Sequence, residues 1–237
     1  MTLSQDEQDR IWSHYQVQQR ESFDLSYPRL RYFAERCRAG SRVLNIGVGN
    51  GYLESLLVER NVEVYSLDPS AESIGRLRDE LGVGQRAQQG YSQRMPFDPD
   101  YFDTVIMTEV LEHLPSDTLH ATLNEVRRVL KPGGEFAGTV PYREDLAANE
   151  VTCPHCRREF HRWGHEQRFD STSLRMLLEE HGYSIDRMYA RAFPDFRRRG
   201  VRPLMKAVVR YMLGRLGEPL VGPNLYFRAR RPRDGAE

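Results

Sequence analysis

Three glycines stand at alternate positions, Gly47, Gly49 and Gly51, between a short apolar run and a helical pattern. A strand that turns sharply into a helix exposes backbone N–H groups and the helix N-terminus to a ligand, and glycine lets that ligand approach closely. In an open α/β sheet, nucleotide-like ligands bind at such a turn. Dinucleotide-binding proteins space these glycines as G-x-G-x-x-G, so the spacing here argues against a nicotinamide oxidoreductase.

Two cysteines and two histidines form a second group with chemical potential, Cys153-x2-Cys156-x4-His161-x3-His165. Thiolates and imidazoles at such spacing suit a tetrahedral zinc ion. A CxxC pair away from a thioredoxin-like helix also favours metal over a disulfide. The pattern is similar to a zinc knuckle, and we expect these four residues to hold a structural Zn2+. The alternative is two free thiols and two surface histidines.

The segments that must position these residues alternate between strand and helix patterns. Strands are expected at 43–46, 62–67, 86–89, 102–108 and 136–140, with helices at 52–60, 71–81 and 117–130. This alternation predicts an α/β fold with a parallel, doubly wound sheet. Two helices broken at Pro28 are expected over 5–39. After an irregular insert at 142–170 come a helix (171–181), a strand (183–193), a helix (201–216) and a strand (224–230).

Composition sets further bounds. The 237 residues include 34 Lys and Arg against 34 Asp and Glu, so the formal net charge is zero. No global field therefore draws the chain to nucleic acid or membrane. Basic residues nevertheless outnumber acidic ones between 187 and 233. The N-terminus does not read as a signal peptide, and no apolar run approaches the ~20 residues of a transmembrane helix. We expect a cytoplasmic protein.

Four segments together resemble class I S-adenosylmethionine-dependent methyltransferases: VLNIGVGNG, VYSLDPS, FDTVIMTEVLEHL and EVRRVLKPGGEFAGTVP. The resemblance is specific over about residues 40–142. It implies a Rossmann-like, mostly parallel sheet with an antiparallel last strand. The organisation would be a helical cap at 1–40 and a methyltransferase domain at 41–237 that contains the insert.

The resemblance also assigns cofactor contacts. The glycine turn would hold the methionine and ribose portions, Asp68 would accept hydrogen bonds from the ribose hydroxyls, and Thr108 and Glu109 would lie beside the reacting methyl group. Tyr91 stands where an aspartate commonly binds adenine, so Ser92 or Gln93 would supply that polarity. The expected cofactor-binding residues are Asn45, Gly47, Gly49, Gly51, Asp68, Pro69, Ser92, Gln93, Met95, Thr108 and Glu109.

The EVLEH segment resembles metal-dependent O-methyltransferases of quinone biosynthesis and of small-RNA 3′ ends. The resemblance implies a catalytic divalent metal at Glu109, Glu112 and His113, which His165 could complete. The same motif also occurs in methyltransferases without a metal, where Glu112 and His113 cap and pack the loop. Without a metal, His161 or His165 would be the general base, because neutral imidazole is suited to deprotonating a hydroxyl.

The expected reaction is O-methylation of a saccharide, a glycan precursor or a secondary metabolite, since tryptophans and tyrosines could stack on a ring. An RNA 2′-O-methyltransferase is the nearest alternative, although zero net charge provides no broad phosphate-binding stripe. A non-catalytic S-adenosylmethionine-binding protein is another. The amphipathic helix at 201–216 would pack on the sheet or pair in a homodimer; its basic face could instead hold a lipid-linked or phosphorylated substrate.

Overall fold

The computed structural model describes residues 5–13, 26–196, 200–216, 218 and 223–233. The N-terminal helical region is described in two parts, α1 (Gln5–Ser13) and α2 (Tyr27–Ala34). Pro28 lies in the first turn of α2, where a missing backbone N–H costs nothing. The part of the expected first helix over 14–25 lies outside the described residues.

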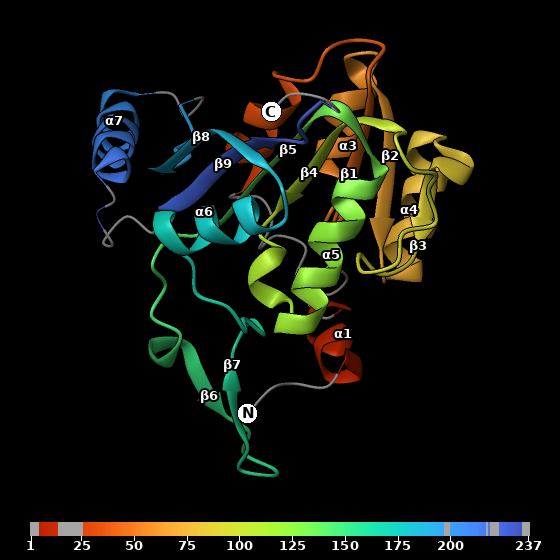
Figure 1. Cartoon of the computed structure of the whole chain (residues 1–237). Helices are drawn as coiled ribbons and strands as arrows, with labels where there is room; N and C mark the ends of the chain where they lie inside the picture. Colours follow the sequence, from red (N-terminus) through yellow and green to blue (C-terminus); the bar gives the residue numbers. More distant parts are fainter. Residues whose placement is uncertain (1–4, 14–25, 197–199, 217, 219–222, 234–237) are drawn as a thin grey trace.

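A seven-stranded sheet in the order β3-β2-β1-β4-β5-β9-β8 forms the centre of the molecule (Figure 1). Strands β1 to β5 pair in parallel, whereas β9 runs antiparallel to both β5 and β8. The predicted doubly wound sheet with an antiparallel last strand is therefore confirmed. Its strands are β1 (Arg42–Ile46), β2 (Glu63–Asp68), β3 (Ala87–Gln89), β4 (Phe102–Thr108), β5 (Leu130–Pro141), β8 (Ser184–Arg191) and β9 (Asn224–Arg230).

Helices cover both faces of this sheet. One apolar core joins the sheet to α5 (Ser116–Val129) and α6 (Ser171–Glu180). The other joins it to α2, α3 (Tyr52–Glu59) and α4 (Ala71–Leu81). Because both faces are buried, the inner strands are almost continuously apolar, which is why they were recognisable in the sequence.

Two segments differ most from the predictions. Strand β5 begins at Leu130, directly after α5, whereas the sequence predicted a strand from residue 136; the predicted helix at 117–130 agrees with α5 to within one residue at each end. The glycines after Pro132 lie at an irregularity in the pairing with β4, between the pairs Phe102–Leu130 and Thr104–Glu135, and Gly133 has a φ of 81°. The insert at 142–170 was expected to be irregular but contains a hairpin of β6 (Glu150–Thr152) and β7 (Glu159–His161). This hairpin projects from the body of the molecule (Figure 1).

Helix α7 (Val201–Arg215) lies at the edge of the molecule beside β8. Within the described ranges, none of the helices combines the length and apolar character needed to cross a bilayer.

Candidate active site

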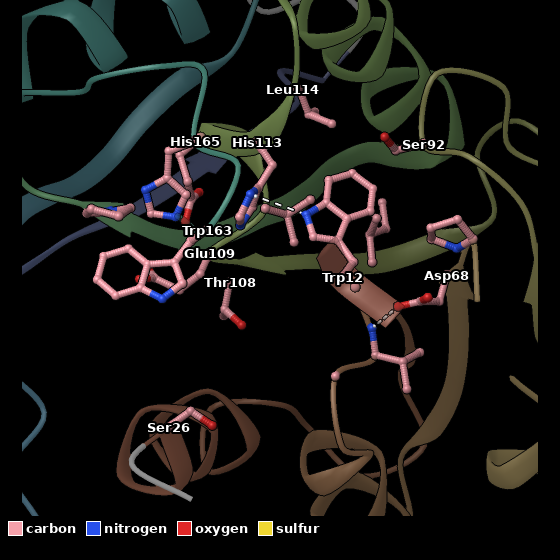
Figure 2. Close-up of a pocket in the computed structure, with 18 of the residues that line it drawn as sticks. Trp12, Ser26, Asp68, Ser92, Thr108, Glu109, His113, Leu114, Trp163 and His165 are labelled. Carbon is pink, nitrogen blue, oxygen red and sulfur yellow. Dashed lines mark hydrogen bonds between the residues drawn. The ribbon is translucent and has the colours of Figure 1, made fainter. Parts of the chain in front are cut away.

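A cavity of about 530 Å³ lies at the carboxyl ends of β1, β2 and β4. The glycine turn and Asp68 form one part of its wall, and the loop after β4 forms another (Figure 2). This edge of a parallel sheet is where α/β proteins bind their ligands. Its size is in the range of pockets that enclose small molecules.

The glycine turn leads from β1 into α3 in a left-handed backbone conformation. The φ angles are 85° at Gly47, 57° at Gly49 and 82° at Gly51, values that glycine adopts without strain. Gly47 and Gly49 line the cavity, whereas Gly51 is the N-cap residue of α3. A Cβ at Gly47 would lie 2.6 Å from Cγ2 of Val110, so the turn also has no room for a side chain.

Asp68 ends β2 and is almost completely buried. Its Oδ2 accepts a hydrogen bond from the backbone N–H of Val48 (2.8 Å), and its Oδ1 accepts one from Ser70 (2.8 Å). The carboxylate is thereby fixed against the glycine turn while Asp68 still lines the cavity, as Pro69 does. A fixed anionic acceptor in this position suits a ligand with hydroxyl groups.

A buried polar network supports the glycine turn from below. The side-chain amide of Asn45 donates hydrogen bonds to Glu54 Oε1 (2.7 Å) and to the carbonyl of Gly47 (3.3 Å). Ser66 also donates to Glu54, and burial raises the pKa of this carboxyl to about 7. Asn45 was expected to contact the cofactor, but the structure places it beneath the turn and outside the cavity lining.

Only part of the segment expected to bind adenine reaches the cavity. Ser92 and Gln93 line the cavity, and Ser92 Oγ lies 2.8 Å from Thr122 Oγ1. Met95 is buried in the core instead, where its backbone N–H donates to Glu125. Tyr91 lines the cavity and donates from its hydroxyl to Asp9 of α1 (2.8 Å).

Thr108 and Glu109 line the cavity at the end of β4. Glu109 has a φ of 57°, an uncommon conformation for a residue with a side chain, of the kind that clusters at functional sites. Its carboxylate accepts a hydrogen bond from Asn224 (2.8 Å) and faces Arg29 at 3.5 Å. Glu109 is thus held by partners from β9 and α2.

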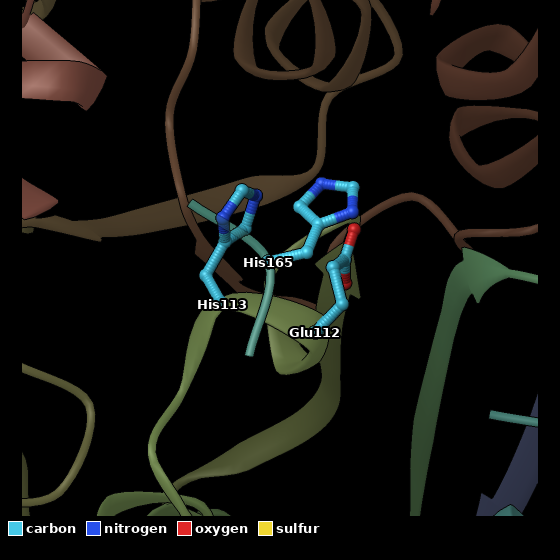
Figure 3. A group of neighbouring side chains, drawn as sticks. All are labelled: Glu112, His113 and His165. Carbon is cyan, nitrogen blue, oxygen red and sulfur yellow. The ribbon is translucent and has the colours of Figure 1, made fainter. Parts of the chain in front are cut away.

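Three potential metal ligands meet on the cavity wall beside Glu109. Ligand atoms of Glu112, His113 and His165 lie within 4.8 Å of one another (Figure 3). Both carboxylate oxygens of Glu112 are buried without a hydrogen-bond partner in the structure. An unpaired buried carboxylate is costly, and coordination of a cation would satisfy it, so this donor set fits a divalent metal ion.

Burial governs protonation in this cluster. Removal from water raises the pKa of Glu112 well above its usual range, and the neighbouring Glu109 carboxylate adds to the increase. Burial likewise lowers the pKa of His113 to about 3, with His165 contributing. A neutral imidazole is the form that binds metals. Nδ1 of His113 faces the indole N–H of Trp12 at 3.4 Å and the carbonyl of Gly164 at 3.3 Å.

Glu144 fixes the orientation of His165. Its Oε2 lies 2.5 Å from His165 Nδ1, so that Nδ1 donates and Nε2 keeps a lone pair. His161 stacks on the His165 ring at 4.5 Å, and its Nδ1 accepts from the backbone N–H of His165. His161 was a candidate general base, but the structure places it behind His165 and outside the cavity lining.

The structure does not bring together the four residues of the predicted zinc site. In the β6–β7 hairpin, His161 pairs with Glu150, whereas Cys153 and Cys156 lie in the turn beyond Thr152. Cys153 is three residues further along the hairpin than Glu150, the partner of His161. In extended chain this places Cys153 roughly 10 Å from the pair formed by Glu150 and His161. The two histidines instead share Glu144 as a neighbour, and no described group of three or more metal-ligating side chains includes a cysteine.

Helix α1 contributes Trp12 to the cavity; the sequence led us to expect aromatic residues of the N-terminal helices near the acceptor, but not the contacts that α1 makes with His113. Gln8 donates to the carbonyl of His113 (3.0 Å), and Trp12 reaches the His113 ring (Figure 2). These contacts span about a hundred positions in the sequence, so no local pattern signals them. Other lining residues that the sequence did not single out as site residues are Arg29, Glu144, Phe193, Arg210 and Asn224.

Comparisons with known proteins agree with this architecture. The methyltransferase domain family matches residues 15–187. An uncharacterized methyltransferase of Geobacillus kaustophilus is 30% identical over 192 residues, covering 78% of this chain and 87% of that protein. A ubiquinone biosynthesis O-methyltransferase of Pseudomonas aeruginosa is 32% identical over 123 residues, which is 49% of this chain and 52% of that protein.

Two solved structures share the fold. One is the methyltransferase in complex with the Haloferax volcanii Trm112 activator, with a TM-score of 0.69, 21% identity and coverage of 94% of this chain and 98% of that one. The other is the Burkholderia thailandensis 1,6-didemethyltoxoflavin-N1-methyltransferase with bound S-adenosylhomocysteine, with a TM-score of 0.64, 18% identity and coverage of 95% and 87%.

The sheet order, the glycine turn and the acidic residue at the end of β2 define a Rossmann-like S-adenosylmethionine-dependent methyltransferase. The chain belongs to the methyltransferase domain family.

Proposed function

We propose that this protein is an O-methyltransferase whose acceptor presents two neighbouring hydroxyl groups to a divalent metal ion. The single observation that carries the proposal is the juxtaposition of Glu112, His113 and His165, with both Glu112 oxygens buried and unpaired. The cluster shares one cavity with Asp68 and the glycine turn. The likeness to a ubiquinone biosynthesis O-methyltransferase covers only half of the chain and supports transfer to an oxygen atom.

The residues around the cofactor would bind and align it. Gly47 and Gly49 leave room for the ligand against the backbone, and Asp68 offers carboxylate oxygens to its ribose hydroxyls. S-adenosylmethionine, when bound, supplies the electrophilic methyl group. The chain therefore has to hold an acceptor oxygen in line with that methyl group and to remove its proton.

The metal cluster would promote loss of the proton from the acceptor hydroxyl. Glu112, His113 and His165 would hold the ion, and Glu144 keeps the lone pair of His165 on Nε2. A divalent ion, when bound, would lower the pKa of a coordinated hydroxyl, so that its proton could pass to solvent water before methyl transfer. Trp12 and Trp163 line the same cavity and can stack on a sugar or an aromatic ring. A saccharide, a glycan precursor or a secondary metabolite fits this lining.

The test measures metal binding and methyl transfer separately. Calorimetric titration of chelator-treated protein with Mn2+ should show one site, and Glu112→Gln should remove it. Glu144→Ala should weaken Mn2+ binding by about 10- to 100-fold, whereas Glu144→Gln, which keeps an acceptor for His165 Nδ1, should retain most of the affinity. Glu150→Gln, an exposed change on β6, is the matched control. S-adenosylhomocysteine binding should survive every one of these changes.

Transfer of a labelled methyl group to a catechol, compared with the corresponding phenol, tests the need for two hydroxyls. Metal-dependent methylation of the catechol alone is the expected result. Equal methylation without metal would overturn the metal proposal and favour His165 as general base. Binding of S-adenosylhomocysteine without any transfer across acceptors would favour a non-catalytic binding protein.

An RNA 3′ end is a second acceptor to include, because its terminal ribose also carries two neighbouring hydroxyls. An oligonucleotide with a free 3′-terminal diol and one with a 3′-phosphate form the matched pair. Methylation of the first alone would favour an RNA 2′-O-methyltransferase over a small-molecule enzyme.

A further inference from the structure

Helix α7 presents an apolar face to solvent rather than to the protein. Seven large apolar side chains from this segment are about half to four-fifths exposed, with 58% for Met212 and 74% for Val201. They are Val201, Leu204, Met205, Val208, Val209, Met212 and Leu216. Single exposed apolar residues are common, but a contiguous set of this size marks an interaction surface.

The helical period places these side chains on one stripe. With 3.6 residues per turn, the seven positions fall within an arc of about 140°, centred between Val201 and Met212. The buried positions, Ala207 and Gly214, lie on the opposite side. There the helix contacts the body closely, because a Cβ at Gly214 would lie 2.5 Å from Cβ of Ala192. The apolar stripe is thus the outer face of a helix already docked by its other side.

The charges on α7 have one sign. The helix carries Arg202, Lys206, Arg210 and Arg215 and no acidic residue. Arg202 and Lys206 flank one border of the apolar stripe, while Arg215 lies near the other border with its guanidinium over the Tyr189 ring at 4.5 Å. An apolar face bordered by cations is the pattern of helices that lie in the headgroup region of anionic membranes.

We propose that α7 docks on an anionic lipid surface, with its apolar stripe in the acyl–headgroup boundary and Arg202 and Lys206 at the phosphates. The proposal does not depend on the metal or on the acceptor. It does have a consequence for the site, because Arg210 of α7 and Phe193, which follows β8, both line the active-site cavity. Arg210 lies on the side of α7 opposite the stripe, so docking would place α7 between the lipid surface and the cavity and bring the active site close to amphiphilic acceptors.

Vesicle flotation of the full chain tests the proposal. The protein should float with phosphatidylglycerol-containing vesicles, bind pure phosphatidylcholine vesicles far less, and lose affinity as salt screens the charges. Val208→Asp combined with Met212→Asp should reduce binding by about tenfold or more, since it places charges at the centre of the stripe. Arg202→Gln and Lys206→Gln should each reduce it by about fivefold.

Met176→Asp is the matched control, because Met176 is 65% exposed but lies on α6. S-adenosylhomocysteine binding by each variant shows that the fold is intact. Absence of flotation with the anionic vesicles, or flotation that the Val208 and Met212 changes leave intact, would overturn the proposal. Light scattering measures the oligomeric state. A dimer that the Val208 and Met212 changes dissociate would identify the stripe as an interface between copies of this chain and would overturn the lipid proposal.

Discussion

Asp68 shows how one side chain can shape a loop and bind a ligand. Its two oxygens accept backbone hydrogen bonds from Val48 and Ser70, and the residue still lines the cavity. Oxygens of a carboxylate have more than one lone pair, so ribose hydroxyls can be added to these partners. The sequence pattern identified Asp68 by its place at the end of a strand but gave no indication of the two backbone bonds.

Asp68→Asn tests this role. The amide removes the negative charge and one acceptor, so we expect S-adenosylhomocysteine binding to weaken by roughly 1–3 kcal/mol. Calorimetric titration measures the loss, and thermal unfolding shows whether the turn itself has loosened. Asp117→Asn, the same change at an exposed position on α5, should alter neither. Unchanged affinity in Asp68→Asn would remove this residue from the cofactor site.

The histidines show that ligand spacing along the sequence does not establish that the ligands meet in space. The spacing of Cys153, Cys156, His161 and His165 fits zinc, yet the hairpin register separates the thiols from the imidazoles. The register of a hairpin is set by its turn and by which side chains are buried, and ligand spacing along the chain does not report it. Glu144, which orients His165, carries no local signal because the two residues meet only in the folded insert.

At the scale of elements, the glycine turn between β1 and α3 combines backbone conformation with close packing. Gly47 and Gly40 both have left-handed φ angles, 85° and 75°. They differ in their surroundings: a Cβ at Gly47 would lie 2.6 Å from Val110, whereas one at Gly40 would meet no atom within 4 Å. Comparing the two positions therefore distinguishes two reasons for glycine: a left-handed backbone, which both share, and the lack of space for a Cβ, which applies only to Gly47.

Gly40→Ala should destabilise the protein by about 1–2 kcal/mol through backbone strain alone. Gly47→Ala should cost a further 1–3 kcal/mol, roughly, because Val110 must move, and it should also weaken cofactor binding. Urea unfolding and S-adenosylhomocysteine titration measure the two effects. Equal stability losses in the two variants would show that Val110 relaxes freely and that the close approach has no energetic consequence.

The elements themselves were largely predictable between residues 43 and 140. Strands such as FDTVIMT are buried on both faces and therefore stand out as apolar runs between turn residues. The start of α6 near residue 171 was also predictable: its N-cap Asp170, a residue type favoured at this position, accepts hydrogen bonds from the N–H groups of Thr172 and Ser173. The β6–β7 hairpin was missed because its strands are short and mostly exposed, so they lack the alternation that marks a half-buried strand.

At the scale of the whole molecule, the cavity depends on contacts between distant parts of the chain. Trp12 from α1, Asn224 from β9 and Arg29 from α2 all reach the loop after β4. Sequence reasoning could assign the sheet edge as the ligand site, because parallel strands end there by topology. It could not specify which side chains from the two ends of the chain close that site, because only tertiary packing brings them together.

Glu54 gives the whole molecule a predictable pH dependence. It lies on α3 and joins Asn45 of β1 to Ser66 of β2. Burial, helped by the Asp68 carboxylate and opposed by the hydrogen bonds from Asn45 and Ser66, raises its pKa to about 7. In the unfolded chain its pKa would be about 4.3. At pH values between these two pKa values, the Glu54 carboxyl is protonated in the native state and ionised in the unfolded state. The free energy of unfolding therefore falls as the pH rises through this range.

Glu54→Gln removes this titration while keeping a side chain of nearly the same shape. The stability of the variant relative to the wild type should therefore rise between pH 5 and pH 8, by on the order of 3 kcal/mol. Urea unfolding of both proteins at a series of pH values, in the presence of a chelator, measures the difference. Other titrating groups are common to the two proteins and cancel in it. A difference independent of pH would mean that Glu54 ionises normally, and that water reaches the network beneath the glycine turn.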